Sequence, residues 1–280
     1  MQMWKPSVPI IFFQVGDFMR IGAKRFLEIA VRQAALASPA SNVILLTDLV
    51  LPNLPEITQV ALTDHREAAA KFERVYRHTS VNDAQYEMFC FSRWFYIRDF
   101  VRRHGIERFC VFDCDILLFD PVEHFVAEFD GYQAGNWTWA NVICARALDL
   151  MCDYFERIFR DRQLLTVLAE RYRIGDAPHI SDMMALLELA KGDPVFLNQN
   201  ALPAKGFDDN INQSMDGLFV MDGPIKWLTV GADGIPVGRC AGDGAAVPFH
   251  FLHFQSDAKS LMAKFAWHGQ IYELARLMLG

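Results

Sequence analysis

Two carboxylates, Asp113 and Asp115, stand one residue apart in the segment Arg108–Pro121, which is otherwise mostly apolar. The apolar runs on either side of them are typical of buried strands. Ionised carboxylates are costly to bury unless they are paired or bind a metal. Alternate residues of a strand point to the same side, so both carboxylates can face one cation while Cys114 faces the core. Mn²⁺ and Mg²⁺ suit such a site, because they prefer carboxylate oxygens and leave positions for substrate phosphates. A pair of acids that ends a strand is the alternative.

A histidine and a lysine near the end of the sequence supply complementary chemistry. His253 follows an apolar run that is typical of a strand, and Lys259 stands six residues further on. An imidazole can bind a metal ion, and an ammonium can neutralise a metal-bound diphosphate. The alternative is a core histidine, for which His250 is an equal candidate, and a surface lysine.

The first 115 residues alternate between patterns typical of strands and of helices. Strands are predicted at residues 8–13, 43–46, 57–62 and 109–112, and helices at residues 18–37, 66–73 and 86–103. This alternation predicts an α/β fold with a Rossmann-like, mostly parallel central sheet that helices flank on both faces. Ligands of such sheets bind beyond the carboxyl ends of the strands. Three segments should therefore meet there: Gln14–Asp17, Thr47–Asp48 and the acids at 113 and 115.

The second half of the sequence is less regular. We predict a helix over residues 147–168, a helix from Asp182 with Ser181 as its N-cap, a β-like segment over 247–254 and an amphipathic helix over 261–279. Residues 207–244 are rich in Gly, Asp, Asn and Pro and are predicted to form loops with short strands. No repeat or linker divides the sequence, so we expect a single domain over residues 1–280. Its nucleotide-binding half would be residues 1–120, and its acceptor-side half residues 121–280.

Composition and charge argue against several classes of function. The chain has 280 residues, 52% of them apolar, and a formal net charge of −7, which argues against a general nucleic-acid-binding protein. Its six cysteines show no CxxC pair or zinc-site spacing, which fits a reduced, cytoplasmic protein. No apolar run is long enough for a transmembrane helix. The closing helix is expected to pack or to form a homodimer. Peripheral membrane contact is a second interpretation, with Lys259, Lys264 and Arg276 as a sparse basic face.

Together, the DxD acids and the later histidine and lysine carry a resemblance to a known family. The chain resembles the metal-dependent, nucleotide-sugar-dependent glycosyltransferases of the GT-A fold, and its pattern is closest to glycosyltransferase family 8, which includes glycogenin and galactosyltransferase-like enzymes. That family has a C-terminal His-x-x-Gly-x-x-Lys motif, which here reads His253-x-x-Ser256-x-x-Lys259. Serine stands in place of the glycine, and a Ser-Leu pair in place of the Pro-Trp that often follows. A serine Cβ resists positive φ, which bears on how closely the backbone approaches a phosphate. The resemblance spans roughly residues 8–259.

The resemblance implies roles for further residues on the donor side. It implies that Asp113, Asp115 and His253 bind Mn²⁺ or Mg²⁺, and that the donor contacts Gln14, Gly16, Asp17, Asp48, Arg93, Asp113, Ser256 and Lys259. Arg93 lies on the helix before the DxD acids, where Glu87 is expected to pair with it. A simple ion pair is the alternative for Arg93, and turn caps are the alternative for Asp17 and Asp48.

On the acceptor side, Asp182 matches a position where these enzymes often place an acid near the acceptor and the reacting carbon. Its carboxylate could accept the acceptor's proton or stabilise an oxocarbenium-like state. The alternative is an acid in a first helical turn, which the helix dipole favours. Aromatic faces and amides that suit a sugar come from Asn136, Trp137, Trp139 and Asn141. Tryptophans are also common core residues.

The leading hypothesis is a glycosyltransferase that moves a sugar from a nucleotide-diphosphate donor, with a UDP-sugar favoured, to a hydroxyl of a glycan, lipid-linked or peptide acceptor. The divalent ion would act as a Lewis acid, and Lys259 would neutralise the leaving diphosphate. Membership of family 8 would imply retention of anomeric configuration. A phosphatase of the haloacid dehalogenase type and a metal-dependent nucleotidyltransferase are alternatives, although the phosphatase motif usually lies on the first strand. A non-catalytic binding protein on a transferase fold is a third hypothesis.

Overall fold

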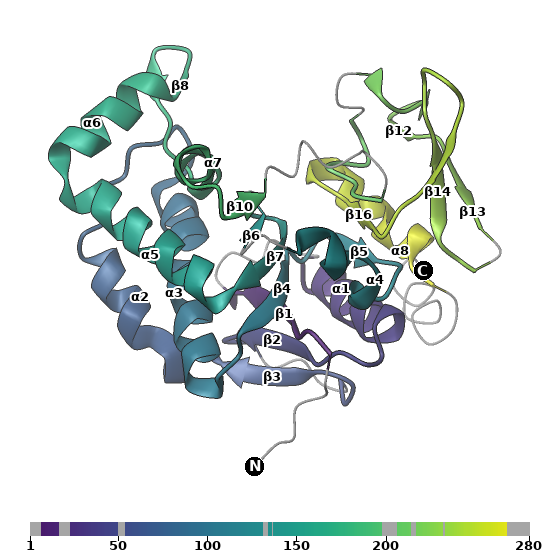
Figure 1. Cartoon of the computed structure of the whole chain (residues 1–280), viewed down its shortest axis with the longest axis horizontal. Coiled ribbons are helices and arrows are strands. Elements are labelled where there is room, and N and C mark those ends of the chain that lie inside the picture. The colour runs from purple at the N-terminus through teal and green to yellow at the C-terminus, as the bar shows by residue number, and fades with distance from the viewer. Residues whose placement is uncertain are drawn as a thin grey trace.

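The computed structural model describes residues 7–16, 23–49, 54–130, 134–135, 137–197, 206–213, 217–231 and 233–267. Within these ranges a seven-stranded sheet has the strand order β10-β6-β7-β4-β1-β2-β3 (Figure 1). Its strands are β1 (Ile10–Gln14), β2 (Val43–Thr47), β3 (Thr58–Ala61), β4 (Arg108–Phe112), β6 (Ala134–Gly135), β7 (Ala140–Cys144) and β10 (Phe196–Leu197). Strands β4, β1, β2 and β3 are mutually parallel, and β7 runs antiparallel to both β4 and β6. The predicted α/β fold with a mostly parallel sheet is confirmed.

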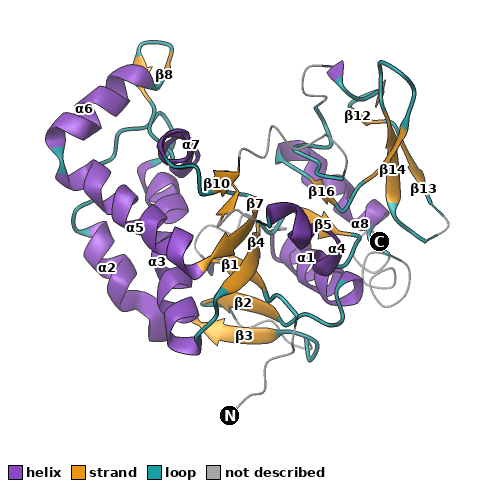
Figure 2. Ribbon diagram, in the orientation of Figure 1, coloured by secondary structure: helices purple, strands orange, loops and turns teal. Residues whose placement is uncertain are grey.

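Helices cover both faces of this sheet (Figure 2). On one side lie α2 (Arg66–Glu73), α3 (Ala84–His104), α5 (Ala145–Arg160), α6 (Arg162–Arg171) and α7 (Asp182–Gly192), and on the other α1 (Ala23–Ala37) and α4 (Val122–Val126). Strand alternation supplies each side with its own core. Ile10 and Phe12 of β1 pack with α1, whereas Ile11 and Phe13 pack with α3 and α5.

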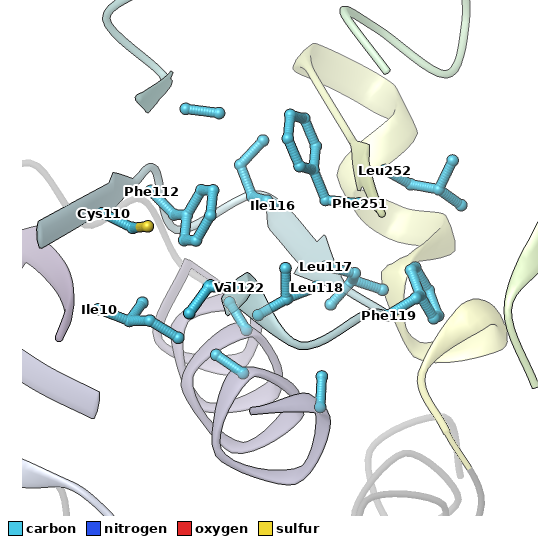
Figure 3. Close-up of a cluster of buried hydrophobic side chains, with 14 of the residues drawn as sticks. Ile10, Cys110, Phe112, Ile116, Leu117, Leu118, Phe119, Val122, Phe251 and Leu252 are labelled. Atoms are coloured by element: carbon cyan, nitrogen blue, oxygen red, sulfur yellow. The ribbon is translucent and has the colours of Figure 1, made fainter. Parts of the chain in front are cut away.

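A short second sheet ties the DxD segment to the far end of the sequence. Strand β5 (Ile116–Leu118) pairs antiparallel with β16 (Phe251–His253), and Ile116 lies opposite His253. Apolar side chains hold the two strands against the main sheet. Figure 3 shows Phe112, Ile116 and Phe251 together in this cluster, and the rings of Phe112 and Phe251 are 5.8 Å apart.

Short strands and turns form the rest of the described chain. They are β8 (Arg173–Ile174) with β9 (Ala177–Pro178), β11 (Met221–Asp222) with β12 (Ile225–Lys226), and β13 (Leu228–Val230) with β14 (Pro236–Arg239) and β15 (Ala246–Pro248). Three 3₁₀ segments are described, Leu62–His65, Ala127–Phe129 and Ser256–Leu261, and α8 (Met262–Phe265) follows the last of them. None of the helices in the described ranges is long and apolar enough to cross a membrane.

Several sequence predictions of local structure can be compared with these elements. Gly105 ends α3 with a φ of 61°, and the Ser181 hydroxyl accepts the Met184 N–H at 3.3 Å, so both predicted caps are confirmed. The predicted helix over residues 147–168 is wrong as one element, because Asp161 breaks it and caps α6. Of the predicted closing helix, the structure describes residues up to 267, and the remainder lies outside the described residues.

Candidate active site

The carboxyl ends of β1 and β2 meet as the sequence predicts. The N–H of Gly16 donates to Asp48 Oδ1 at 2.7 Å, and Gln14 lies opposite Thr47 in the parallel register. A Cβ at Gly16 would come within 2.9 Å of the Leu49 side chain, which would have to shift to accommodate it. Gln14, Gly16 and Asp48 are thus brought together, whereas Asp17 lies outside the described residues.

The DxD acids lie in a turn directly after the strand that the sequence predicts over residues 109–112, so strand alternation does not set where their side chains point. Strand β4 ends at Phe112, and the N–H of Ile116 donates back to the carbonyl of Asp113 at 3.1 Å. The turn is fixed from outside, because the N–H of Asp113 donates to Trp139 O at 2.7 Å and the N–H of Phe254 donates to Asp115 O at 2.9 Å. The β5–β16 pairing then places Asp115 beside His253.

We call Asp115, His253 and Lys259 the Asp115 group. His253 Nε2 lies 3.6 Å from Asp115 Oδ1, and Lys259 Nζ lies 3.0 Å from Asp115 Oδ2. Among the residues that the structure describes, Oδ1 is buried without a hydrogen-bond partner. Although burial opposes the ammonium charge, the Asp115 carboxylate raises the pKa of Lys259. One carboxylate oxygen of this group therefore has no donor or cation within bonding distance in the described part of the chain.

The contacts of His253 define which ring nitrogen faces Asp115. Nδ1 lies 2.5 Å from the carbonyl oxygen of Asp209, which can only accept a hydrogen bond, so Nδ1 carries the proton. In the neutral ring, Nε2 then has the free lone pair, as a metal-binding imidazole requires. The ring also stacks on Trp139, with centroids 5.7 Å apart and planes 14° apart.

A divalent ion fits this arrangement. Two ligand atoms that each lie about 2.1 Å from one ion can be up to about 4.2 Å apart, so the 3.6 Å between Asp115 Oδ1 and His253 Nε2 allows a shared ion. Among the described residues, no group of three or more His, Cys, Asp and Glu side chains is arranged to hold a metal. Mg²⁺ commonly takes one or two carboxylates and completes its shell with water and substrate phosphates.

A second set of charges, the Arg93 group, consists of Arg93, Asp113 and Asp182. Arg93 Nη1 donates to Asp113 Oδ1 at 2.6 Å, and Nη2 donates to Asp182 Oδ2 at 2.9 Å and to Thr138 O at 3.1 Å. The indole N–H of Trp94 also donates to Asp182 Oδ2, at 3.1 Å. The guanidinium and the Asp182 carboxylate are buried, whereas 33% of the Asp113 side chain is exposed.

The three charges of the Arg93 group influence one another strongly. Burial opposes the Arg93 charge, yet the two carboxylates raise its pKa. Burial raises the pKa of Asp113, the Arg93 guanidinium opposes that rise, and Asp115 adds to it. Glu87 does not pair with Arg93, contrary to the prediction from the sequence. Its Oε2 accepts from Ser80 Oγ at 2.9 Å and Asn82 Nδ2 at 2.7 Å.

Ser256, which stands where the family motif has glycine, has a φ of 55°. It is the one non-glycine residue with positive φ among the described residues. The chain thus adopts the left-handed conformation that the motif's glycine would favour, in spite of the serine Cβ. Ser256 opens the 3₁₀ segment that carries Lys259 toward Asp115.

The residues predicted to bind the sugar differ in their surroundings. The Asn141 side chain is buried and bonds the backbone of Gly135 and Trp137, so it shapes the loop. Trp139 stacks on Trp137, with centroids 5.2 Å apart, and on His253. Its indole N–H is buried and has no hydrogen-bond partner within the described ranges. Asn136 lies outside the described residues. Sequence reasoning missed Trp94 and Asp209, whose contacts form only in the folded chain and leave no local pattern.

The sequence matches no protein-family model and no curated protein. Among solved structures, it is similar to mouse xyloside xylosyltransferase 1 in its apo form, with 10% identity over 68% of this chain and 84% of that one and a TM-score of 0.48. It is similar to the glycosyltransferase GlyE of Streptococcus pneumoniae TIGR4, with 11% identity over 98% of this chain and 64% of GlyE and a TM-score of 0.48. For the galactosyltransferase LgtC in complex with donor and acceptor sugar analogs, identity is 11%, coverage is 96% of each chain and the TM-score is 0.44. At such identities and TM-scores, a functional proposal has to come from the side chains of this chain.

Proposed function

We propose that the protein is a metal-dependent glycosyltransferase of GT-A type that uses a nucleotide-diphosphate sugar, with a UDP-sugar favoured. The observation that carries the proposal is the Asp115 group. A buried carboxylate oxygen without a partner, an imidazole with its lone pair toward that oxygen and an ammonium stand together at the carboxyl end of a mostly parallel sheet. Such a set is suited to a divalent ion and the diphosphate that the ion carries.

At the donor end, Asp115 and His253 would hold Mn²⁺ or Mg²⁺, and Asp113 borders the same site. Bound there, the ion would supply Lewis-acid stabilisation of the leaving diphosphate. Lys259 would add its positive charge to the departing phosphate oxygens, from a side chain that is 41% exposed and free to turn from Asp115. The left-handed backbone at Ser256 supports a close approach of the chain to a phosphate.

At the reacting centre, the Asp182 carboxylate would stabilise developing positive charge and would not accept a proton. Its Oδ2 already accepts hydrogen bonds from Arg93 and Trp94, and proton transfer to that oxygen would have to break them. A fixed carboxylate suits the positive charge that develops at the anomeric carbon as its bond to the diphosphate breaks. The acceptor hydroxyl oxygen, from a glycan, lipid-linked or peptide acceptor, would form the new bond to that carbon as the bond to the diphosphate breaks, and the hydroxyl proton would pass to an oxygen of the departing diphosphate.

The test is a thermal-shift measurement with UDP and Mn²⁺, separately and together. We expect a rise in Tm of about 5 °C that requires both, since ligand at about 100 times its Kd adds about 2.7 kcal/mol to the free energy of unfolding. Asp115→Asn should abolish the rise, whereas Asp257→Asn, an exposed acid on the same 3₁₀ segment, should retain it. Hydrolysis of a panel of nucleotide-sugars with either metal would then identify the donor.

Other outcomes would favour the other hypotheses. Release of inorganic phosphate from simple phosphomonoesters would favour a phosphatase, although Asp113, which would have to be its nucleophile or acid, is bonded to Arg93. No shift with any nucleotide, together with no donor hydrolysis, would favour a binding protein. A cytoplasmic location, a single domain and a homodimer through the closing helix stay predictions from the sequence.

A further inference from the structure

A fully buried ion pair lies behind His253. Asp208 is 0% exposed and Lys226 is 2% exposed, and the Lys226 ammonium bonds Asp208 Oδ1 and donates to the carbonyl of Asn210 at 2.9 Å. The same ammonium lies 5.2 Å from the ring centre of Phe219 and 5.9 Å from that of Phe249. A buried ion pair is weak support for stability, because apolar residues of similar volume often serve as well. Stability alone therefore does not explain why this ion pair is buried here.

The other oxygen of Asp208 holds the backbone of His253. Oδ2 accepts the His253 N–H at 2.8 Å, and the carbonyl of the next residue, Asp209, accepts Nδ1–H of the His253 ring. The backbone of Ile211 also bonds His253. Its N–H donates to the carbonyl of His253 at 2.8 Å, and its carbonyl accepts the N–H of Lys226 at 2.8 Å. Every polar group of His253 except Nε2 is thus bonded by residues 208–211, and Lys226 bonds that segment at three places.

We propose that Asp208 is a positioning residue that fixes the backbone and ring of His253, so that Nε2 points at Asp115 with the proton kept on Nδ1, and that Lys226 supplies the counter-charge of the buried Asp208 carboxylate. The proposal rests on the proposed function, because a metal ion at Asp115 is what uses that nitrogen. Partners behind a metal-binding histidine commonly set its orientation and tautomer. Here the hydrogen bond to the main chain comes from the Asp208 side chain, whose buried charge is balanced by Lys226.

Two double variants separate this role from packing. In Asp208→Leu/Lys226→Met, the pair is apolar and of similar volume, so the protein should fold, but the His253 N–H loses its acceptor. In Asp208→Asn/Lys226→Met, the charges are also gone, but the amide oxygen of the introduced asparagine can still accept that N–H. Single variants are unsuitable, since each would leave a buried charge without its partner. Cooperative unfolding by denaturant would verify that both double variants fold.

The first readout is Mn²⁺ binding in the presence of UDP, measured by calorimetry. We expect the Leu/Met variant to bind Mn²⁺ about 10- to 100-fold more weakly than the wild type, and the Asn/Met variant to stay within about threefold. Affinity unchanged in the Leu/Met variant would overturn the proposal, and so would an equal loss in both variants.

The second readout needs no metal. Nitrogen-15 chemical shifts of His253 should show the proton on Nδ1 in the wild type and the Asn/Met variant, and a mixture of tautomers in the Leu/Met variant. Identical tautomers in all three proteins would overturn the proposal. If the wild type binds neither Mn²⁺ nor UDP, the proposed function fails, while the tautomer measurement still decides whether Asp208 positions the ring.

Discussion

The Arg93 group and the Asp115 group are both built from carboxylates and cations, but they differ in how completely their charges are satisfied. Arg93 and Asp182 are buried to 9% and 4% side-chain exposure, and fixed N–H donors occupy Asp182 Oδ2. In the Asp115 group, one oxygen has no hydrogen-bond partner and the lysine is 41% exposed.

The supporting elements explain this difference. Arg93 and Asp182 lie on α3 and α7, regular helices that pack into the same hydrophobic core. Asp115, His253 and Lys259 lie on a turn, the end of a three-residue strand and a 3₁₀ segment. Asp182 Oδ2 is satisfied within the protein and so helps to stabilise the fold, although Arg93 Nε is buried without a hydrogen-bond partner among the described residues. Asp115 Oδ1 has no partner among those residues, so this carboxylate oxygen has capacity for a ligand. Substitutions in the Arg93 group should therefore mainly reduce stability, whereas substitutions in the Asp115 group should mainly reduce ligand binding.

The largest effect on stability is expected from Arg93→Met. It would leave the Asp182 carboxylate buried without its cation, and breaking a buried pair in this way costs about 3–5 kcal/mol of unfolding free energy. Urea denaturation at neutral pH measures the change. Arg102→Met, which removes a surface pair with Asp149, is the matched control and should cost less than about 1 kcal/mol. Equal losses for the two variants would show that the Arg93 group does not differ from a surface pair.

Lys259→Met should show the reverse pattern. The lysine is 41% exposed, but its ammonium is bonded to the buried Asp115 carboxylate, so the free energy of unfolding should fall by about 1–3 kcal/mol, less than for Arg93→Met. Loss of a cation beside the diphosphate should raise the donor KM or lower kcat about tenfold or more, in steady-state kinetics with the donor found by hydrolysis. Lys264→Met, on an exposed position of α8, should leave both quantities unchanged. A stable, fully active Lys259→Met protein would remove the lysine from the site.

The two groups also differ in how far the sequence predicts them. Strand–helix alternation in the sequence predicts the parallel sheet. It also predicts that Gly16 and Asp48 lie close together, because they follow the successive parallel strands β1 and β2. The pairing of Asp115 with His253 was reached through a motif resemblance, since no local pattern shows that β16 will pair with β5. The bonds of Arg93 to Asp182 and of Asp208 to His253 join residues far apart in the sequence. Their partners are decided by tertiary packing, which is also why Glu87 was assigned to Arg93 wrongly.

Ser256→Gly probes strain in the Asp115 group. A non-glycine residue in the left-handed region is strained by roughly 1–2 kcal/mol, and glycine removes that strain but costs about 0.5–1 kcal/mol in backbone entropy. We expect a net gain of about 0.5 kcal/mol in unfolding free energy by urea denaturation. Ser260→Gly, in the same 3₁₀ segment and without a positive φ, should lose about 0.5–1 kcal/mol instead. Loss of stability in both variants would mean that Ser256 is not strained.

The smallest effect concerns Glu87, a buried acid on α3. Its carboxylate has two neutral donors and no bonded cation among the described residues, in contrast to the acids of the Arg93 group. Burial raises the pKa of Glu87 above its ordinary value of 4.5, although the bonds from Asn82 and Ser80 oppose that rise. A raised pKa means that the folded protein binds the proton more tightly than the unfolded chain does. The stability that Glu87 contributes is therefore fully present below about pH 4.5 and is lost as the pH rises through the folded-state pKa.

Glu87→Gln cannot ionise and its amide oxygen can still accept both hydrogen bonds, so relative to wild type it should be more stable at pH 7 than at pH 4, by a few tenths of a kcal/mol. Urea denaturation at several pH values gives this difference, with Glu170→Gln on the exposed side of α6 as a control whose difference should not vary with pH. If the difference in unfolding free energy between Glu87→Gln and wild type is also independent of pH, a cation compensates the Glu87 charge, and Glu87 belongs with the Arg93 group.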